Sequence, residues 1–414
     1  MKAPRILLAG LLALSTSGVA QAQSTITLHL TGSTAFRTAV QNAIIHILQP
    51  GYSAAFVGSS FTGAGEAIVS GTTISNINGS PASVTIQTYW SGSLAGIQAV
   101  STELSLPNFL SSGNSTSGGT TTALSSPVFE SDIPEVCMSD GFQNTTQFSP
   151  PNPQYPALSH QNVGVVVFDF VKNNGAPAGL TNMTPLLAQT LWENNGTLPL
   201  SMWTGNTNDV TNTIYAVGRN PDSGTRKTAF LETGIQTFIS AVTQQAVYQY
   251  APSNANGLVT SANKGQITKQ GFWPPSTVDG LSFVKGNGGY SSGGDLAAAM
   301  GQVSPYNYVT YLGLSDTATA TGLGATVLTY NGVAFSHTAV QNGTYTFWTI
   351  EQMDWLPVGT GIMTQNQLAL AELLATQIAN ENLSGVGESL TSMNVTRNQE
   401  GGRVIPGTMS STTP

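Results

Sequence analysis

An arginine followed by hydroxyl-bearing and small residues stands near the middle of the chain. The segment, RNPDSGT at residues 219–225, lies between a strand-like run at 213–217 and a helix-like run from Arg226 to about residue 242. A guanidinium followed by hydroxyls and backbone amides at a helix start is suited to binding a tetrahedral oxyanion. The whole chain has only 12 Lys and Arg, so the clustering of Arg219, Arg226 and Lys227 needs an explanation. The segment predicts a site for a small anion.

Two further loops place small and hydroxyl-bearing residues between a predicted strand and a predicted helix. Gly32, Ser33 and Thr34 follow the strand-like residues 25–30 and precede a helical pattern at 35–48. Ser93 follows the strand-like residues 83–90 and precedes a helical pattern at 94–104. Each hydroxyl also has an ordinary explanation as a helix N-cap. Because the carboxyl ends of parallel strands share one crevice, we expect the three loops to meet there.

The alternation of strands and helices predicts an α/β fold with mixed, mostly parallel sheets. Residues 163–168 are continuously apolar, as in a strand that is buried on both faces. A chain of 414 residues with 40% hydrophobic and 8% charged residues suits two domains of ordinary size with long polar loops.

The first 22 residues have the pattern of a signal peptide. Lys2 and Arg5 precede an apolar run at 6–14, and an Ala-Gln-Ala cleavage site occupies residues 20–22. We therefore expect export to a Gram-negative periplasm, without a lipid anchor because no Cys follows the cleavage site. Removing the two positive charges moves the formal net charge from −8 to −10, and so acidic a chain is not expected to bind nucleic acid.

The residues that usually form metal or catalytic sites are sparse. Cys137 is the only cysteine, expected to be a buried and inert thiol, and the four His are scattered without metal-ligand spacing. We expect no cofactor, no metal and no catalytic residue.

A secreted serine hydrolase is one alternative. Gly289-Tyr290-Ser291-Ser292-Gly293 matches a nucleophile elbow, and Asp316 and His337 follow in triad order. An elbow should directly follow a strand, however, and residues 285–288 intervene here. A second alternative is an extracellular binding or scaffold protein, which the Gly-, Ser- and Asn-rich loops would suit.

The motifs occur in an order that resembles the phosphate-binding proteins of bacterial ABC transporters, which have the type II periplasmic-binding fold. The matching phrases are GSTAF at residues 32–36, SLAGI at 93–97, Ser131-Asp132 and RNPDSGT at 219–225. The resemblance implies a monomer with two lobes, a ligand cleft between them and delivery of phosphate or a similar oxyanion to a membrane permease. It divides the chain into a signal peptide (1–22), the first part of lobe 1 (23–160), lobe 2 (161–320), the return part of lobe 1 (321–400) and a disordered tail (401–414).

The resemblance also implies ligand-binding residues. Arg219 would be the charged group, and Asp132 would accept the proton of a protonated phosphate. The expected hydrogen-bond donors to the ligand are Ser33, Thr34, Ala35, Ser93, Ser223, Gly224 and Thr225. One departure is Pro221, because many members of the family carry an acidic residue there; Asp222 lies one place later. Arg226 and Lys227 are expected to be surface residues.

Overall fold

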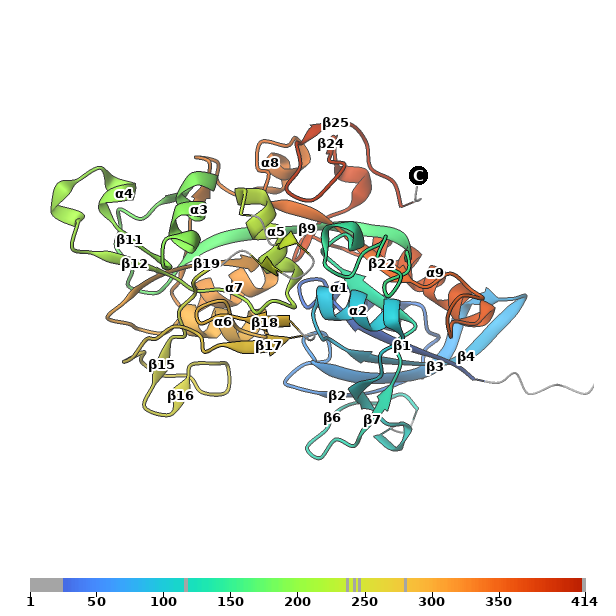
Figure 1. Ribbon diagram of the computed structural model, residues 1–414. Coiled ribbons are helices and arrows are strands. Elements are labelled where there is room, and N and C mark those ends of the chain that lie inside the picture. The colour runs from blue at the N-terminus through green and yellow to red at the C-terminus, as the bar shows by residue number, and fades with distance from the viewer. Residues whose placement is uncertain are drawn as a thin grey trace, which may run out of the picture.

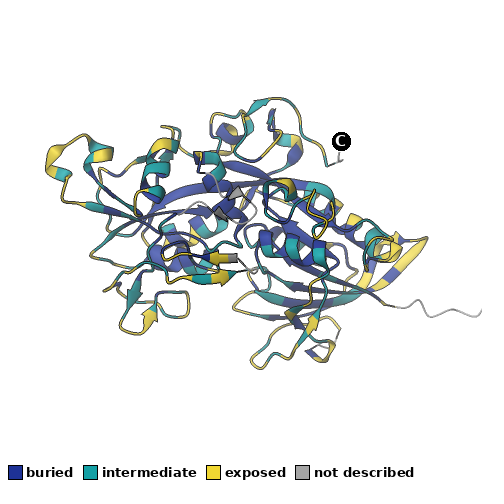
Figure 2. Ribbon diagram, in the orientation of Figure 1, coloured by how far each residue is buried: buried dark blue, intermediate teal, exposed yellow. Residues whose placement is uncertain are grey.

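Two paired strands form the middle of the large sheet and are shared by both halves of the molecule. In the computed structural model they are β9 (Ser159–Lys172) and β22 (Trp348–Trp355), which pair antiparallel in the middle of a 13-stranded sheet (Figure 1). The structure describes residues 25–114, 118–235, 238–240, 243–244, 247–278 and 281–411. Every residue of β22 and the last ten residues of β9 are buried (Figure 2). The apolar run at 163–168 therefore forms the strand that the sequence predicts.

The sheet is mixed, which confirms the predicted α/β class. Parallel pairs join β1 to β4 and β8, β2 to β6, and β12 to β19, whereas β9 and β22 pair antiparallel with each other and with their other neighbours. The strand order is β11-β12-β19-β9-β22-β8-β1-β4-β3-β2-β6, with β20 and β23 also on β9. The bounds of these strands are β1 Ile26–Gly32, β2 Ser53–Val57, β3 Glu66–Ile77, β4 Ser80–Tyr89, β6 Thr121–Ala123, β8 Val136–Ser139, β11 Thr197–Pro199, β12 Thr213–Ala216, β19 Asn307–Gly313, β20 Thr326–Val327 and β23 Gly387–Glu388.

Helices cover both faces of the sheet. Val136 and Met138 of β8 belong to the main core cluster with α1 (Arg37–His46) and α9 (Gln365–Asn380), whereas Cys137 between them packs with α2 (Ser93–Thr102). Adjacent residues of a strand point to opposite faces, so α2 lies on the face opposite α1 and α9. Together with strands β8, β1, β4, β3, β2 and β6, these helices form what we call lobe 1.

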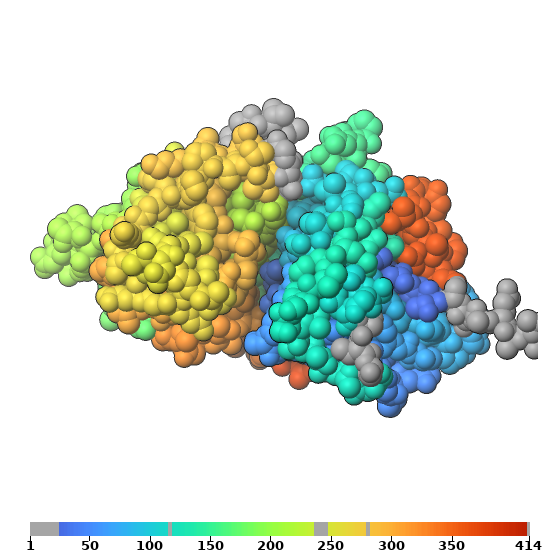
Figure 3. Space-filling view, turned by 90° about the horizontal axis from the view of Figure 1, so that it is seen from below, coloured from blue at the N-terminus to red at the C-terminus, as the bar shows by residue number. Residues whose placement is uncertain are grey.

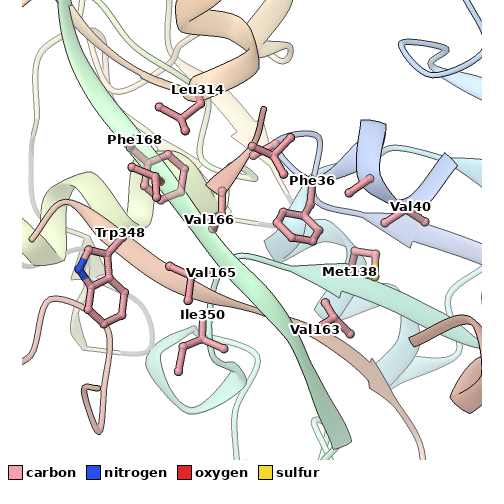
Figure 4. Close-up of a cluster of buried hydrophobic side chains, with 14 of the residues drawn as sticks. Phe36, Val40, Met138, Val163, Val165, Val166, Phe168, Leu314, Trp348 and Ile350 are labelled. Atoms are coloured by element: carbon pink, nitrogen blue, oxygen red, sulfur yellow. The ribbon is translucent and has the colours of Figure 1, made fainter. Parts of the chain in front are cut away.

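Lobe 2 is built around strands β11, β12 and β19. Its helices are α3 (Pro185–Glu193), α4 (Ser201–Thr204), α5 (Gly224–Thr233), α6 (Gly293–Met300) and α7 (Leu314–Gly322). A furrow separates the two lobes in the space-filling view (Figure 3). The main core cluster includes Val163, Val165 and Val166 of β9, which lie with Phe36 and Ile350 (Figure 4).

The strand–loop–helix units occur where the sequence places them, but the helix after Arg219 is shorter than expected. Instead of reaching about residue 242, α5 ends at Thr233, because Gly234 adopts a left-handed conformation with φ of 82° that closes the helix. The Gly-, Ser- and Thr-rich stretch at 111–126 contributes the edge strand β6, which pairs with β2.

The predicted domain boundaries differ from what is seen at the C-terminal end. The chain enters lobe 2 along β9, close to residue 160, but its return to lobe 1 runs through β22, well after residue 320. Part of the tail predicted to be disordered is ordered: β25 (Ile405–Pro406) pairs with β24 (Val395–Thr396), and Val404 and Met409 pack on the main core. The predicted signal peptide (1–22) and residues 412–414 lie outside the described residues.

Candidate functional site

Three helix starts lie at the boundary between the lobes. The first turns of α1 and α2 follow β1 and β4, neighbouring parallel strands of lobe 1, and α5 begins shortly after β12 in lobe 2. The N-cap residue of α1, Phe36, makes no side-chain cap hydrogen bond. The first N–H groups of a helix have no partner within the helix, so the start of α1 offers donors to an anion.

Arg219 lies at the centre of this boundary and is only 3% exposed. Its Nε donates to the carbonyl of Tyr290 at 3.1 Å, and its Nη2 donates to the carbonyl of Ser291 at 2.9 Å and to Thr34 Oγ1 at 3.4 Å. The bond to Thr34 crosses from lobe 2 to lobe 1. The guanidinium is therefore held in one orientation by lobe 2 and contacts the predicted donor of lobe 1.

Asp140, directly after β8, is the carboxylate of the site. It is 1% exposed, accepts a hydrogen bond from Ser93 at Oδ1, and accepts one from Thr225 at Oδ2 over 3.2 Å. It also lies against the start of α5: a Cβ placed on Gly224 would be 1.5 Å from Asp140 Oδ1. Only glycine leaves room for this approach. One acceptor thus joins donors from both lobes.

The lobes also meet through backbone. Leu94 N–H, in the first turn of α2, donates to the carbonyl of Asp222 at 3.1 Å. Gly92 approaches so closely that a Cβ would lie 2.8 Å from the same carbonyl oxygen, and its φ of 102° favours glycine. Ser223 Oγ accepts from Arg226 N–H at 3.2 Å and so caps α5. The structure therefore has the two lobes closed on each other.

Charges of both signs surround Arg219. Burial lowers its pKa, whereas Asp316 and Asp140 raise it. Asp316, at the start of α7, reaches the start of α6, where a Cβ on Gly293 would lie 1.9 Å from Asp316 Oδ2 and 3.2 Å from Arg219 Nη1. Arg37 interacts electrostatically with Asp316 and Arg219. Burial raises the pKa of Asp140, and Glu400 raises it further. The site combines two guanidinium groups with two carboxylates.

The prediction that Arg226 and Lys227 are surface residues is wrong. Arg226 is 6% exposed and donates to the carbonyls of Arg219, at 2.9 Å, and Asn287, at 3.2 Å. Lys227 is 2% exposed and pairs with Glu400 over 2.6 Å. Arg226 thus contacts the backbone of Arg219 itself, and Lys227 belongs to a buried ion pair. Asn287 and Glu400 are distant in sequence from these cations, so spacing alone could not reveal those two pairings.

The structure places Asp132 away from the other predicted site residues. Asp132 ends β7 (Phe129–Asp132), an exposed strand that pairs with β5 (Leu106–Leu110) outside the main sheet. Its side chain is 40% exposed, and its Oδ2 lies 3.6 Å from His29 Nε2. Asp140 takes the position expected for Asp132, because β8 ends next to β1 whereas β7 pairs with β5 in a separate two-stranded sheet.

The hydrolase alternative lacks its base. His337, the first residue of α8 (His337–Gln341), bonds through Nδ1 to Glu388. Ser291 is exposed, and its backbone carbonyl accepts a hydrogen bond from Arg219. Asp316 faces Arg219 and Arg37 instead of a histidine. A nucleophile needs a base within hydrogen-bond reach, and no such bond between Ser291 and His337 occurs in the described part of the chain.

Most predicted residues do come together. Thr34, Ser93, Arg219, Gly224 and Thr225 meet around Asp140 and Asp316, while Ser33 and Ala35 are buried beside them. The sequence motifs did not assign Arg37 or Asp140 to the anion site, and they indicated Asp316 only as a member of a hydrolase triad. Ser139-Asp140 repeats the Ser-Asp phrase that was sought, eight residues later and directly after an apolar strand.

Within the described ranges, no group of three or more His, Cys, Asp or Glu residues could hold a metal ion. A search of the same residues finds no helix long and apolar enough to cross a membrane.

Known proteins resemble this chain in structure but not in sequence. No protein-family model and no curated protein matches it. A putative phosphate ABC transporter substrate-binding protein from Clostridium perfringens, solved with bound phosphate, is 12% identical over 86% of this chain and 96% of its own, with a TM-score of 0.46. An ABC-type phosphate transport receptor from Vibrio cholerae is 9% identical (85% and 97% covered, TM-score 0.41). PstS from Borrelia burgdorferi is 11% identical (86% and 93% covered, TM-score 0.37).

Proposed function

We propose that this protein binds inorganic phosphate between its two lobes, without chemical change, and delivers it to a membrane ABC permease. One observation carries the proposal: a buried acceptor, Asp140, lies among donors that come from both lobes, close to the buried Arg219. A site made only of donors would suit any oxyanion. A site with an added buried carboxylate suits an oxyanion that also carries a proton.

The binding mode follows from these groups. Thr34, the first N–H groups of α1 and Arg219 would hold phosphate oxygens. The hydroxyls of Ser93 and Thr225, which bond to Asp140 in this structure, would turn to phosphate oxygens. The phosphate O–H would then donate to Asp140 in their place. No covalent step and no cofactor is required, and the protein would act as a monomer in the periplasm after removal of residues 1–22.

Sulfate is the discriminating competitor. It has the same shape and charge as hydrogen phosphate, but at neutral pH it has no proton to donate. Asp140 would then face sulfate as a buried carboxylate without a donor, which costs about 1–3 kcal/mol or more. We therefore expect a preference for phosphate over sulfate of at least about fivefold.

Calorimetric titration of the mature chain with phosphate and with sulfate tests the proposal. Thr34→Val removes one hydroxyl from the lobe boundary and should weaken phosphate binding about tenfold. Thr38→Val is the matched control, because Thr38 lies four residues after Thr34, in the first turn of α1, and donates to the carbonyl of Thr62. Absence of phosphate binding by the unmodified protein would refute the proposal, and equal binding of both anions would refute the role of Asp140.

A further inference from the structure

Glu351 is a buried carboxyl group next to the site. It lies on β22, where its backbone pairs with Gly164 of β9, and it is 0% exposed. Ser33 Oγ lies 3.4 Å from Glu351 Oε2. Among the described residues, Glu351 Oε1 has no hydrogen-bond partner although it is buried. A single hydroxyl is thus the whole hydrogen-bonding environment seen for this side chain.

The charges around Glu351 oppose its ionised form. The groups that face it electrostatically are Asp140 at the end of β8, Asp354 on β22 and Cys137 on β8. Within the described residues, no ion pair joins Glu351 to a cation. Arg219 interacts with Asp140 and Asp316, and Lys227 pairs with Glu400. Two neighbouring buried carboxyl groups cannot both ionise without compensation. Asp140 accepts hydrogen bonds from two hydroxyls, so Glu351 is the one that keeps its proton.

The state of Glu351 decides what the Ser33 hydroxyl can do. A hydroxyl has one hydrogen to donate and can also accept. An ionised Glu351 is only an acceptor, so it would take the Ser33 hydrogen for itself. A protonated Glu351 can donate to Ser33 Oγ, and the Ser33 hydrogen is then free for another acceptor.

We propose that Glu351 is a positioning residue that stays protonated and donates to Ser33, so that the Ser33 hydroxyl can donate to the bound oxyanion. This inference rests on the proposed function for the ligand. It adds a proton held on the protein to the conditions for tight binding. Deprotonation of Glu351 would turn Ser33 away from the ligand and place a second negative charge beside Asp140.

The direction of the pH effect follows. Burial, and then the charge of Asp140, raise the pKa of Glu351 well above its ordinary value. In the proposed state, affinity gained through Ser33 is present below this raised pKa and is lost when pH rises through it. Phosphate itself titrates near neutral pH, so the informative quantity is the ratio of affinities between the unmodified protein and a variant at each pH.

Glu351→Gln is the variant that tests the proposal. Glutamine has the same shape and always carries a donor for Ser33, so phosphate affinity at pH 7 should stay within about threefold of the unmodified protein. Ser33→Ala should weaken binding about tenfold in both backgrounds. Glu388→Gln is the matched control, because Glu388 is also buried but bonds to Gln341 and His337 on α8.

Infrared difference spectroscopy of the ligand-free protein gives a second readout. Subtracting the spectrum of Glu351→Gln should reveal a protonated-carboxyl band at pH 7. The affinity ratio should change only at the pH at which this band disappears. A carboxylate band in its place, no effect of Ser33→Ala, or a ratio that changes at a different pH would overturn the proposal. If the unmodified protein binds no phosphate, the proposed function fails, and the infrared result still decides whether Glu351 is protonated.

Discussion

Two Ser-Asp pairs lie eight residues apart in this chain and have different environments. Ser131-Asp132 ends β7 in the two-stranded β5–β7 sheet, and the Asp132 side chain is 40% exposed. Ser139 ends the buried strand β8, which lies between β1 and β22, and Asp140 directly after it is 1% exposed. The same dipeptide is therefore a surface carboxylate in one place and the buried acceptor of the site in the other. Position at the carboxyl end of a central strand makes the difference.

The supporting charges differ as well. Asp140 interacts electrostatically with Glu400 of the buried Lys227–Glu400 pair. Asp132 instead lies next to His29, whose Nδ1 is 3.2 Å from Glu135 Oε2. One region depends on a charge pair removed from water, and the other on a histidine whose charge varies with pH. Substitutions at these residues test each difference between the two regions.

Breaking the buried pair should have the largest effect. Lys227→Met leaves Glu400 buried without its cation, and we expect a loss of about 3–5 kcal/mol in the free energy of unfolding, measured by urea denaturation. Adding Glu400→Gln removes the unpaired charge and should restore part of the loss. If Lys227→Met alone costs less than about 1 kcal/mol, the pair does not support the site.

The two carboxylates should differ sharply in ligand binding. Asp140→Asn replaces an acceptor with a group that can point a donor at the phosphate proton, so phosphate affinity should fall about 10- to 100-fold. The preference over sulfate should disappear as well. Asp132→Asn should leave both titrations unchanged. Calorimetry on the two variants under one set of conditions decides between them, and equal losses would mean that Asp140 has no special role.

His29 should make the stability of the region around β7 depend on pH. Burial lowers the pKa of His29, but the hydrogen bond and charge of Glu135, with Asp132 and Glu130, outweigh this and raise it above 6.5. A raised histidine pKa stabilises the fold below the unfolded value and loses this contribution as pH rises through the folded value. His29→Gln should therefore destabilise the protein more at about pH 5.5 than at about pH 8.5, by up to about 1 kcal/mol. A difference that does not vary with pH would exclude a charged His29.

Asp132 should contribute least to stability. Its half-exposed carboxylate lies 3.6 Å from the His29 ring, and such pairs contribute about 0–1 kcal/mol. Asp132→Asn is expected to change the free energy of unfolding by less than about 0.5 kcal/mol in urea denaturation. A loss above about 2 kcal/mol would show that this carboxylate fixes the β5–β7 sheet in place.

Local patterns were sufficient for much of the fold. The apolar alternation of residues 25–30 and 83–90 and the small residues after them predicted β1, β4 and the starts of α1 and α2. The same patterns located the Arg219 loop. Local patterns could not predict long-range pairings such as that of Lys227 with Glu400, which are 173 positions apart. Asp132 and Asp140 share the same preceding residue, so only the register of β8 beside β1 distinguishes them.

The hydrogen bond from Leu94 to the carbonyl of Asp222 has a consequence for how this protein tolerates change. The bond uses backbone atoms only, so its existence depends on the length and path of the 219–225 loop and not on which side chain stands at 222. Replacing Asp222 should leave it intact, whereas inserting or deleting one residue in the loop should abolish it. The closed arrangement of the lobes thus depends on the length of this loop, which a comparison of side chains position by position does not test.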